Sequence, residues 1–344
     1  MRFDYIIGNP PYQDEAIGDN KTFAPPIYHK FLENAYKVGD VVELIHPARF
    51  LFNAGNTPKQ WNRQMLEDPD LKVLTYEPDS KKVFPNTEIK GGVAVTYHQK
   101  DGSFGAIGTF TPYQELNSIF RKVDGIEGFE SLSSIVVTSY AYHFTDTMHK
   151  ENPDAASLLS KGHAYDLKSN VFDRLPMIFL DEKPDDGKEY VRVLGRANNS
   201  RAYKYIRSEY INEVSNLKFY KVFLPSANGS GGLGETLAAP LIGEPGVGYT
   251  ETFISLGCFD EKESAEALLK YVKTKFARAL FSILKVTQHI TVETWSYVPM
   301  QDFGRTSDID WKGAVSDIDM QLYQKYGLTD GEIRFVESKV KEMD

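Results

Sequence analysis

Four residues near the start of the chain, Asn9-Pro10-Pro11-Tyr12, combine hydrogen-bond acceptors with an aromatic ring. The side-chain oxygen of Asn9 and the backbone carbonyl of Pro10 can accept the two hydrogens of one amine, and proline restrains the direction of its own carbonyl. Two such acceptors would localise the lone pair of an aromatic amine, such as the exocyclic amine of adenine, which is otherwise delocalised into the ring. These residue types therefore indicate amine chemistry that depends on positioning and needs no ionised general base.

Tyr12 extends this arrangement, because its ring can stack on a base that has left the duplex. Such stacking contributes about 1–3 kcal/mol per base. The simpler interpretation is a turn, since Asn and Pro are common turn residues. The position favours chemistry: the motif directly follows the apolar run Asp4-Tyr5-Ile6-Ile7-Gly8, and open α/β sheets keep their ligand sites at the carboxyl ends of strands.

The elements that would position the motif alternate over the first hundred residues. Apolar periodicity predicts strands over 4–8, 41–45, 71–76 and 92–98, and helices over 28–36 and 58–66. Short strands separated by helical segments are typical of α/β units on a largely parallel sheet. After residue 125 this alternation fades, and the polar run 150–154 indicates a domain join.

The second half shows a different pattern. We expect short strands over 190–194 and 219–224, a glycine-rich loop over 228–234 and one long helix over 261–285. One face of that helix is apolar, and the opposite face carries cationic side chains. Thr329 with Glu332 three residues later predicts a capping box at the start of a last helix, 329–343.

Charge is unevenly distributed along this acidic chain, whose formal net charge is −9. The windows 191–221 and 267–292 each carry a net charge of +5, which favours a basic groove for nucleic acid. The alternative is a mixed, solvated surface. The candidates for DNA contact are Arg196, Arg201, Lys204, Lys275, Arg278 and Lys285.

Composition excludes several classes of protein. The 344 residues suffice for two domains, and with 41% hydrophobic residues each half can bury a core. The single cysteine, Cys258, excludes internal disulfides and cysteine-rich zinc modules. No apolar run approaches the ~18 residues of a membrane span. We expect a cytoplasmic protein without membrane contact and without a metal site.

Residues 3–13 closely resemble the catalytic motif of the amino-methylating DNA methyltransferases, including the strand that precedes it. Residues 43–51 are similar to the next strand of those enzymes. Residues 82–93 are similar to a later strand region, where an aromatic side chain covers the other face of the flipped base. The resemblance implies that Asn9, Pro10 and Tyr12 are catalytic and that Phe84 is the second stacking residue, although core packing is an alternative role for Phe84.

The second half resembles, more diffusely, the carboxyl-terminal part of fused restriction-modification methylases of type IIG. The segments that carry this likeness are 193–196, 204–206, 273–278, 285–288, 298–299 and 323–328. The resemblance implies an α/β fold with a partial Rossmann-like methyltransferase sheet over 1–125 and a linker over 126–160. An α+β target-recognition domain for double-stranded DNA would follow over 161–344.

One departure from this family concerns the methyl donor. In these adenine-specific enzymes the strands that bind S-adenosylmethionine precede the Asn-Pro-Pro-Tyr motif, whereas here the motif begins at residue 9. We therefore expect an incomplete S-adenosylmethionine site and a further chain or segment that supplies the missing half. The alternative function is a catalytically silent, sequence-specific DNA-binding module.

Two other patterns compete with this interpretation. Residues 229–234 fit the G-x-G-x-x-G string of dinucleotide sites, but Pro240 and Pro245 interrupt the helix that should follow, which favours a recognition loop. Asp79 with Glu88 and Lys90 fits a divergent nuclease signature in which acids bind magnesium. Matches this short arise by chance, and the same residues fit the methylase pattern.

Overall fold

The computed structural model describes residues 2–14, 24–52, 56–285 and 287–343. The chain divides into two compact units, residues 1–117 and 118–344, which we call unit 1 and unit 2. The elements of unit 1 are β1 (Phe3–Gly8), α1 (Tyr28–Val38), β2 (Gly39–Pro47), η1 (Ala48–Phe52), α2 (Lys59–Glu67), β3 (Leu71–Glu77), η2 (Ser80–Lys82) and β4 (Val93–Gln99). Helix α3 (Gln114–Asp124) spans the boundary between the two units.

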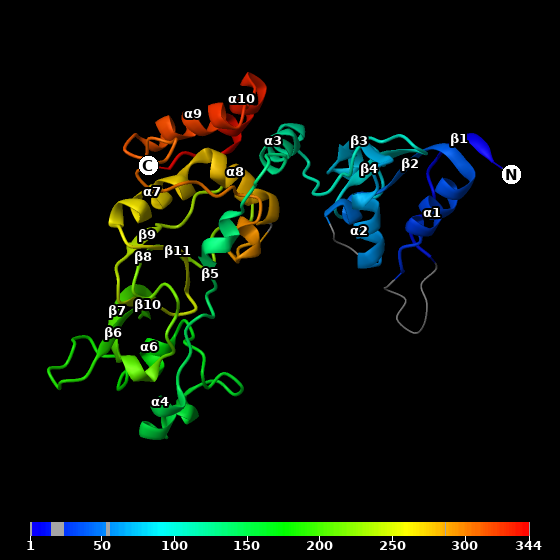
Figure 1. The fold of residues 1–344 in the computed structure, drawn as a ribbon. Helices are drawn as coiled ribbons and strands as arrows, with labels where there is room; N and C mark the ends of the chain where they lie inside the picture. Colours follow the sequence, from blue (N-terminus) through cyan, green and yellow to red (C-terminus); the bar gives the residue numbers. More distant parts are fainter. Residues whose placement is uncertain (1, 15–23, 53–55, 286, 344) are drawn as a thin grey trace. The chain divides into compact units, whose positions relative to one another are not determined.

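Unit 1 contains one four-stranded sheet in the order β1-β2-β4-β3 (Figure 1). The predicted strands and helices of the first hundred residues are confirmed, but the expectation of a largely parallel sheet is wrong. Only β1 and β2 are parallel, and β4 runs antiparallel to both of its neighbours. The cause is the connection between β3 and β4, which contains only the short turn η2 and therefore returns the chain instead of crossing over.

The two faces of this sheet differ. Helices α1 and α2 lie on the same side (Figure 1), and their buried side chains pack on the inward-facing residues of the strands. The main contributors to this core are Tyr28, Leu32, Val42, Leu44, Phe50, Trp61, Met65, Leu71 and Ala94. On the opposite face, Phe3, Tyr5 and Ile7 of the edge strand β1 are 47, 70 and 76% exposed.

Unit 2 is built from many short elements. Its strands are β5 (Val136–Val137), β6 (Tyr190–Ala197), β7 (Ser200–Arg207), β8 (Tyr220–Pro225), β9 (Leu241–Gly243), β10 (Val247–Tyr249) and β11 (Phe253–Phe259). Its α-helices are α4 (Asp146–Glu151), α5 (Ala155–Leu158), α6 (Val171–Arg174), α7 (Lys262–Lys273), α8 (Lys275–Leu284), α9 (Val315–Lys325) and α10 (Asp330–Lys339). Three short 3-10 turns complete it: η3 (Leu132–Ile135), η4 (Ser208–Tyr210) and η5 (Glu293–Trp295).

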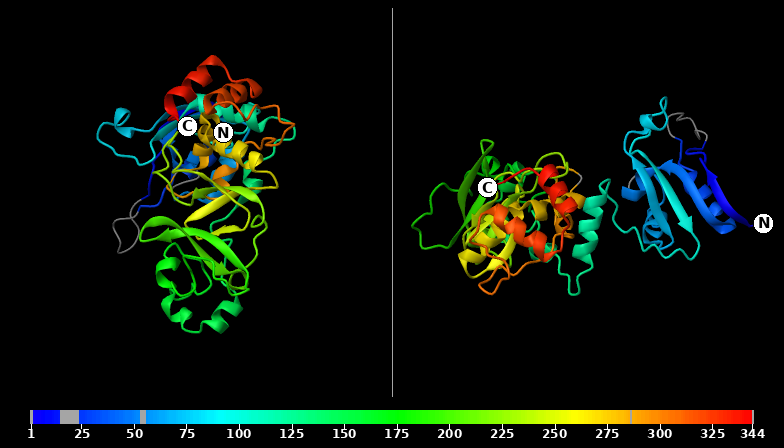
Figure 2. Two further views of the ribbon diagram at one scale, coloured as in Figure 1. Left: turned by 90° about the vertical axis from the view of Figure 1, so that its left-hand side faces the viewer. Right: turned by 90° about the horizontal axis from the view of Figure 1, so that it is seen from above.

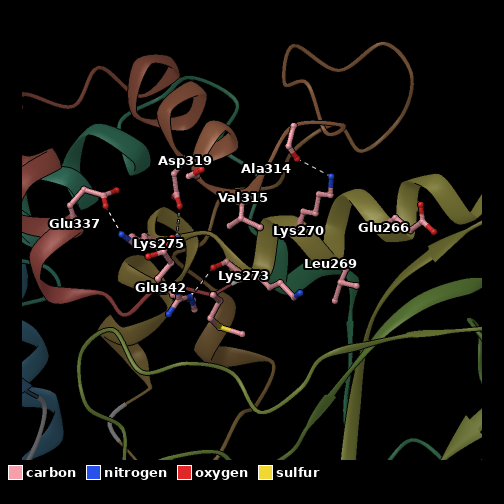
Figure 3. A pocket seen from close by; sticks show the side chains of 14 residues that line it. Glu266, Leu269, Lys270, Lys273, Lys275, Ala314, Val315, Asp319, Glu337 and Glu342 are labelled. Atoms are coloured by element: carbon pink, nitrogen blue, oxygen red, sulfur yellow. Dashed lines mark hydrogen bonds and ion pairs between the residues drawn. The ribbon is translucent and has the colours of Figure 1, made fainter.

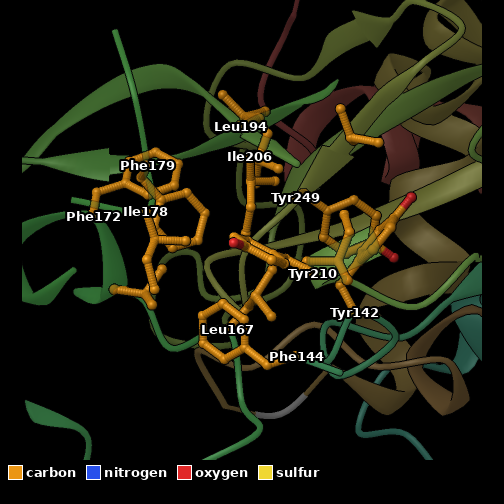
Figure 4. Packing of buried hydrophobic residues seen from close by; sticks show 14 of the residues in the cluster. Tyr142, Phe144, Leu167, Phe172, Ile178, Phe179, Leu194, Ile206, Tyr210 and Tyr249 are labelled. Atoms are coloured by element: carbon orange, nitrogen blue, oxygen red, sulfur yellow. The ribbon is translucent and has the colours of Figure 1, made fainter. Parts of the chain in front are cut away.

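Two sheets organise unit 2, in the orders β10-β6-β7 and β5-β11-β8-β9. Helices α7 to α10 gather at one end of the unit, and α4, α6 and the β6–β7 hairpin lie toward the other (Figures 1 and 2). The aromatic side chains of Phe172, Phe179 and Tyr249 are buried in the core beside the hairpin (Figure 4). The segment 126–160, which we expected to be a linker, contributes Tyr142 and Phe144 to this core and is therefore packed rather than free.

The predicted helix 261–285 is in fact two helices, α7 and α8, separated at Thr274. Thr274 has an extended backbone (φ −56°, ψ 147°), and its hydroxyl accepts from the Ala277 amide. The carboxylate of Asp319 accepts from the amides of Lys275 and Phe276 and so completes the new N-terminus. At the end of the chain the capping box of Thr329 and Glu332 is confirmed at α10.

Candidate functional site

The Asn-Pro-Pro-Tyr motif leaves the carboxyl end of β1, beside the parallel strand β2. Backbone hydrogen bonds connect the end of the motif to the segment that enters α1. The Tyr12 carbonyl accepts from the Ile27 amide at 3.1 Å, and the Asp14 amide donates to the Pro25 carbonyl at 2.9 Å. These bonds hold Tyr12 directly before α1, where the sequence pattern predicted the site.

The motif residues differ in exposure. Asn9 is exposed and Pro10 is half-buried. Tyr12 is also half-buried, and burial raises its pKa to about 12. Its hydroxyl has no hydrogen-bond partner among the residues that the structure describes. Tyr12 is therefore neutral near pH 7.

A cavity of about 530 Å³ lies beside Tyr12. This volume is within the range of small-molecule sites, about 300–1,000 Å³. Its walls include Tyr12, Tyr28, Arg49, Thr57, Glu88 and Lys90. Asn9 is not among its lining residues. The cavity thus combines an aromatic surface with charged groups. Of the predicted catalytic residues, Tyr12 lines it.

A neutral, buried layer supports this cavity. The ring of Tyr28 is parallel to that of His46, with centroids 5.8 Å apart. His46 is fully buried, its Nε2 lies 2.8 Å from Thr96 Oγ1, and burial lowers its pKa to about 4. Burial likewise raises the pKa of Tyr28 to about 12. The charge of the cavity therefore comes from Arg49, Glu88 and Lys90.

Phe84 contacts Tyr12 edge-on. Their ring centroids are 6.3 Å apart and the rings are inclined by 72°. A base between two parallel rings would require one of them to turn, so the stacking role of Phe84 stays a prediction.

The segment that carries Phe84 and Lys90 is anchored by Ser80. This buried hydroxyl donates to the Thr87 carbonyl at 3.0 Å and accepts from the Ile89 amide at 2.8 Å. Sequence reasoning did not identify Tyr28, Arg49, Thr57 or Lys90 as cavity residues. Arg49 and Lys90 lie in segments that resemble methylases, whereas Tyr28 and Thr57 lie outside those segments.

Asp79 and Glu88, the acidic residues of the nuclease alternative, do not form a metal-ligand cluster with other described residues. Within the described part of the chain, the one group of three acidic or histidine side chains close enough to share an ion is Asp68, Asp70 and His98. The Asp70 carboxylate already accepts from the Asp101 and Ser103 amides, as a structural loop anchor does. Asp79 and Glu88 do not belong to this group.

Arg278 contradicts the expectation of a solvent-facing cationic helix. Its side chain is 1% exposed, and its guanidinium donates to the carbonyls of Lys273, Glu235 and Lys341. Burial lowers its pKa to about 10. Arg278 therefore joins α8 to a loop and to the end of the chain.

The other two cations of this set also have internal partners. Lys285 is 4% exposed and forms an ion pair with Glu235 at 3.1 Å. Lys275 pairs with Glu337, beside a cavity of about 470 Å³ in which Asp319 and Glu337 point toward Lys275 (Figure 3). The break at Thr274 and the packing of α9 and α10 thus convert the expected exposed face into an interior.

The β6–β7 hairpin separates the remaining three candidates. Arg196 lies directly opposite Arg201, so both share one face of the hairpin, whereas Lys204 lies opposite Val193 on the other face. Arg196 bonds to Asn199 across the turn, and Lys204 pairs with Asp181. The Arg201 guanidinium donates to the carbonyls of Ala238 and Ala239, so each of these three cations already has a partner within unit 2.

Arg192 shares the face of Arg196 and was missed by sequence reasoning. It is exposed, and its guanidinium carbon lies 4.1 Å from the centroid of the Tyr203 ring. The predicted strand 190–194 ends before Arg196, so the sequence did not indicate that the two residues share a face of one strand.

The glycine-rich loop binds a carboxylate of its own chain. The amides of Ser230 and Gly231 and the Ser230 hydroxyl donate to Glu235, which also pairs with Lys285. These bonds hold the pKa of Glu235 far below its ordinary value despite partial burial. The loop amides that a phosphate would need are thus already engaged.

Comparisons with known proteins concern mainly unit 1. Residues 1–84 match the family model described as Eco57I restriction-modification methylase. A segment of 95 residues, 27% of this chain, is 35% identical to an uncharacterized adenine-specific methylase of Mycoplasma pneumoniae and spans 22% of that protein. The amino-terminal region is thus similar to restriction-modification methylases, and the chain spans much less than the full length of this relative.

Two solved structures show a weaker likeness. The type IIG restriction endonuclease BpuSI has a TM-score of 0.35 and 11% identity, over 90% of this chain and 48% of that enzyme. The type IIL restriction-modification enzyme MmeI in complex with DNA has a TM-score of 0.34 and 8% identity, over 97% of this chain and 56% of that one. Among the described helices, none is long and apolar enough to cross a membrane.

Proposed function

We propose that this chain carries the active-site half and the target-recognition domain of an adenine-specific DNA methyltransferase of a restriction-modification system. The observation that carries the proposal is the match of residues 1–84 to the restriction-modification methylase model. This segment contains the Asn-Pro-Pro-Tyr motif and much of the wall of the cavity beside Tyr12. The substrate would be double-stranded DNA in the cytoplasm.

The chemistry proposed for the motif concerns the exocyclic amine of a flipped adenine. Asn9 Oδ1 and the Pro10 carbonyl accept its two hydrogens, which localises the lone pair on nitrogen and makes that nitrogen nucleophilic. Tyr12 stacks on the base, and Phe84 covers the other face after its ring turns. No side chain ionises, so positioning and preorganised electrostatics supply the rate enhancement.

S-adenosylmethionine is the donor that methylases imply, and we propose that the described residues supply only part of its site. The amides of the glycine-rich loop bind Glu235, and the strand that leads to the motif is an edge strand with exposed apolar side chains. A further chain or segment that pairs with β1 would complete the donor site. We derive no step from the donor itself.

DNA recognition is assigned to unit 2. The exposed face of the β6–β7 hairpin, with Arg192, Arg196 and Arg201, would contact phosphates. Lys204 would act only from the opposite face. Arg278 and Lys285 are weaker candidates because they are buried, and Lys275 is weaker because it pairs with Glu337.

If the donor site is incomplete, as proposed, one alternative function is a catalytically silent DNA-binding specificity module. Calorimetric titration with S-adenosylmethionine tests this point directly. We expect no saturable binding by the chain alone at sub-millimolar concentration, with or without duplex DNA. A one-site isotherm in that range would show that the chain holds a complete donor site.

A methylation map separates the two functions without knowledge of the target sequence. The chain would be co-expressed with the genes adjacent to its own in a host that lacks adenine methylation, and host DNA would be read by single-molecule sequencing. Sequence-specific adenine methylation that depends on Asn9 supports the methyltransferase. Specific DNA binding without any methylation supports the silent module.

A further inference from the structure

The cavity beside Tyr12 contains two cations in addition to its aromatic wall. Arg49 follows β2, and Lys90 comes from the segment between β3 and β4. Neither forms an ion pair with another residue that the structure describes. By contrast Lys82, in the same segment as Lys90, pairs with Glu77.

The backbone is shaped to bring these two cations together. Arg49 Nε donates to the Lys90 carbonyl at 2.5 Å. Gly91 and Gly92 follow with φ of +88° and +76°, a conformation that favours glycine. A Cβ at Gly91 would lie 2.8 Å from Arg49 Cγ, and one at Gly92 would lie 2.4 Å from the Glu77 carbonyl oxygen. Gly91 thus permits the close approach of the Lys90 backbone to Arg49, and Gly92 permits the approach of the same segment to the end of β3.

The chemistry of this pair fits a phosphate. Within the described part of the chain only Nε of Arg49 is engaged in a hydrogen bond, so the two terminal nitrogens of its planar guanidinium stay available for an oxyanion. Lys90 is exposed and adds a mobile positive charge. Among the described lining residues Glu88 is the one acidic side chain, so Arg49, Lys90 and Glu88 together contribute a charge of +1.

We propose that Arg49 and Lys90 bind the phosphate of the nucleotide whose base lies on Tyr12. This inference rests on the proposed function, because it takes the ligand of the cavity to be a flipped nucleotide. An aromatic wall and two unpaired cations in one cavity provide for both parts of a nucleoside monophosphate. Arg49 and Lys90 are then positioning residues, which fix the base through its backbone and do not touch the amine.

The test uses fluorescence titration with 2-aminopurine deoxyriboside and its 5′-monophosphate. Stacking changes the emission of both probes, and they differ only in the phosphate. Because the phosphate can accept charge-assisted hydrogen bonds from Arg49 and Lys90, we expect the monophosphate to bind about tenfold more tightly at low salt. Equal affinity of the two probes would overturn the phosphate site.

Single variants test whether Arg49 and Lys90 cause the preference for the monophosphate. Lys90→Gln and Arg49→Gln should each reduce the preference for the monophosphate at least threefold and leave the affinity for the deoxyriboside within twofold. Lys81→Gln is the matched control, since Lys81 is exposed in the same segment but does not line the cavity. A preference that survives Lys90→Gln, or that Lys81→Gln removes, would contradict the assignment.

Failure of the proposed function has a different signature. Tyr12→Ala should abolish binding of both probes, because it removes the stacking surface. Saturable binding of the deoxyriboside that does not depend on Tyr12 would reject the base site while the preference for phosphate could still be measured. Absence of saturable binding by either probe would reject both.

Discussion

The candidate site residues of the two units differ in burial and in hydrogen bonding. Unit 1 leaves Asn9 exposed and the cavity cations Arg49 and Lys90 without ion pairs among the described residues. Unit 2 encloses Arg278 and Lys285 and gives them internal partners. Polar groups whose hydrogen bonds are already made stabilise the fold, whereas groups left free can bind ligands. Variants at the two kinds of position should therefore change different observables.

The largest expected difference concerns pH. The pKa of His46 in unit 1 is lowered to about 4, so the unfolded chain takes up the proton first as pH falls. The neutral, buried His46 therefore stabilises unit 1 fully above pH 6.5. This stabilisation, about 3 kcal/mol of unfolding free energy, is lost as pH falls from 6.5 to 4. The pKa of Asp319 in unit 2 is raised from 3.8 to about 6, so the folded chain takes up the proton first. The stabilisation of unit 2 by protonated Asp319 is complete below pH 3.8 and is lost as pH rises through 6.

Acidification from pH 6.5 to 4.5 should thus weaken unit 1 and strengthen unit 2. Urea unfolding can follow the units separately through Trp61 in unit 1 and Trp295 in unit 2, in variants that keep one reporter. His46→Gln and Asp319→Asn should each flatten the pH dependence of their own unit only. The same slope in both units would contradict the comparison.

Arg278→Gln should lower the free energy of unfolding by about 3 kcal/mol, because three buried carbonyls lose a charged donor. Arg192→Gln is the matched control on the hairpin. It removes a cation–π interaction worth about 0.5–1 kcal/mol at an exposed site. Chemical denaturation checks both values, and equal losses would show that burial does not separate the two sets.

Asn9→Ala tests the opposite case, an exposed residue without a structural role. In protein complemented with its donor-binding half, turnover should fall about 100-fold or more, since one acceptor of the amine is absent at the transition state. DNA affinity and unfolding free energy should stay unchanged. Asn86→Ala, at an exposed position outside the cavity, should retain full activity. Methyl transfer at the normal rate by Asn9→Ala would remove Asn9 from the mechanism.

The smallest effect concerns salt. Replacing Arg192, Arg196 and Arg201 with Gln should flatten the slope of log affinity against log salt by about 0.9 for each phosphate that the variant no longer neutralises. Lys275→Gln should leave the slope unchanged, because Lys275 pairs with Glu337. Fluorescence anisotropy on duplex DNA measures both. A slope altered only by Lys275→Gln would restore the helix-face assignment.

The sequence predicted those strands, helices and caps that depend on residues close together in the chain. The strands and helices of the first hundred residues follow from apolar periodicity, and the capping box of Thr329 and Glu332 lies within four residues. The direction of β4 was not predictable in this way, because it depends on whether a connection crosses over. The break at Thr274 depends on Asp319, which is 45 residues later in the chain.

The candidate site was predictable only in part for the same reason. The motif could be recognised from four adjacent residues, but the cavity joins Arg49 and Lys90 from distant segments. Burial of Arg278 depends on carbonyls of Glu235 and Lys341, which no helical pattern contains. By contrast, the separation of Lys204 from Arg201 follows from their odd spacing on a strand and could have been predicted.

The edge strand β1 has a consequence for handling and assembly. A row of unpaired backbone groups beside Phe3, Tyr5 and Ile7 is a template for any other extended chain, and natural proteins usually protect such an edge with charge, proline or a covering segment. The chain produced alone should therefore self-associate through this edge as its concentration rises. Pairing of this edge with another strand, or a segment that covers it, would protect the protein from aggregation.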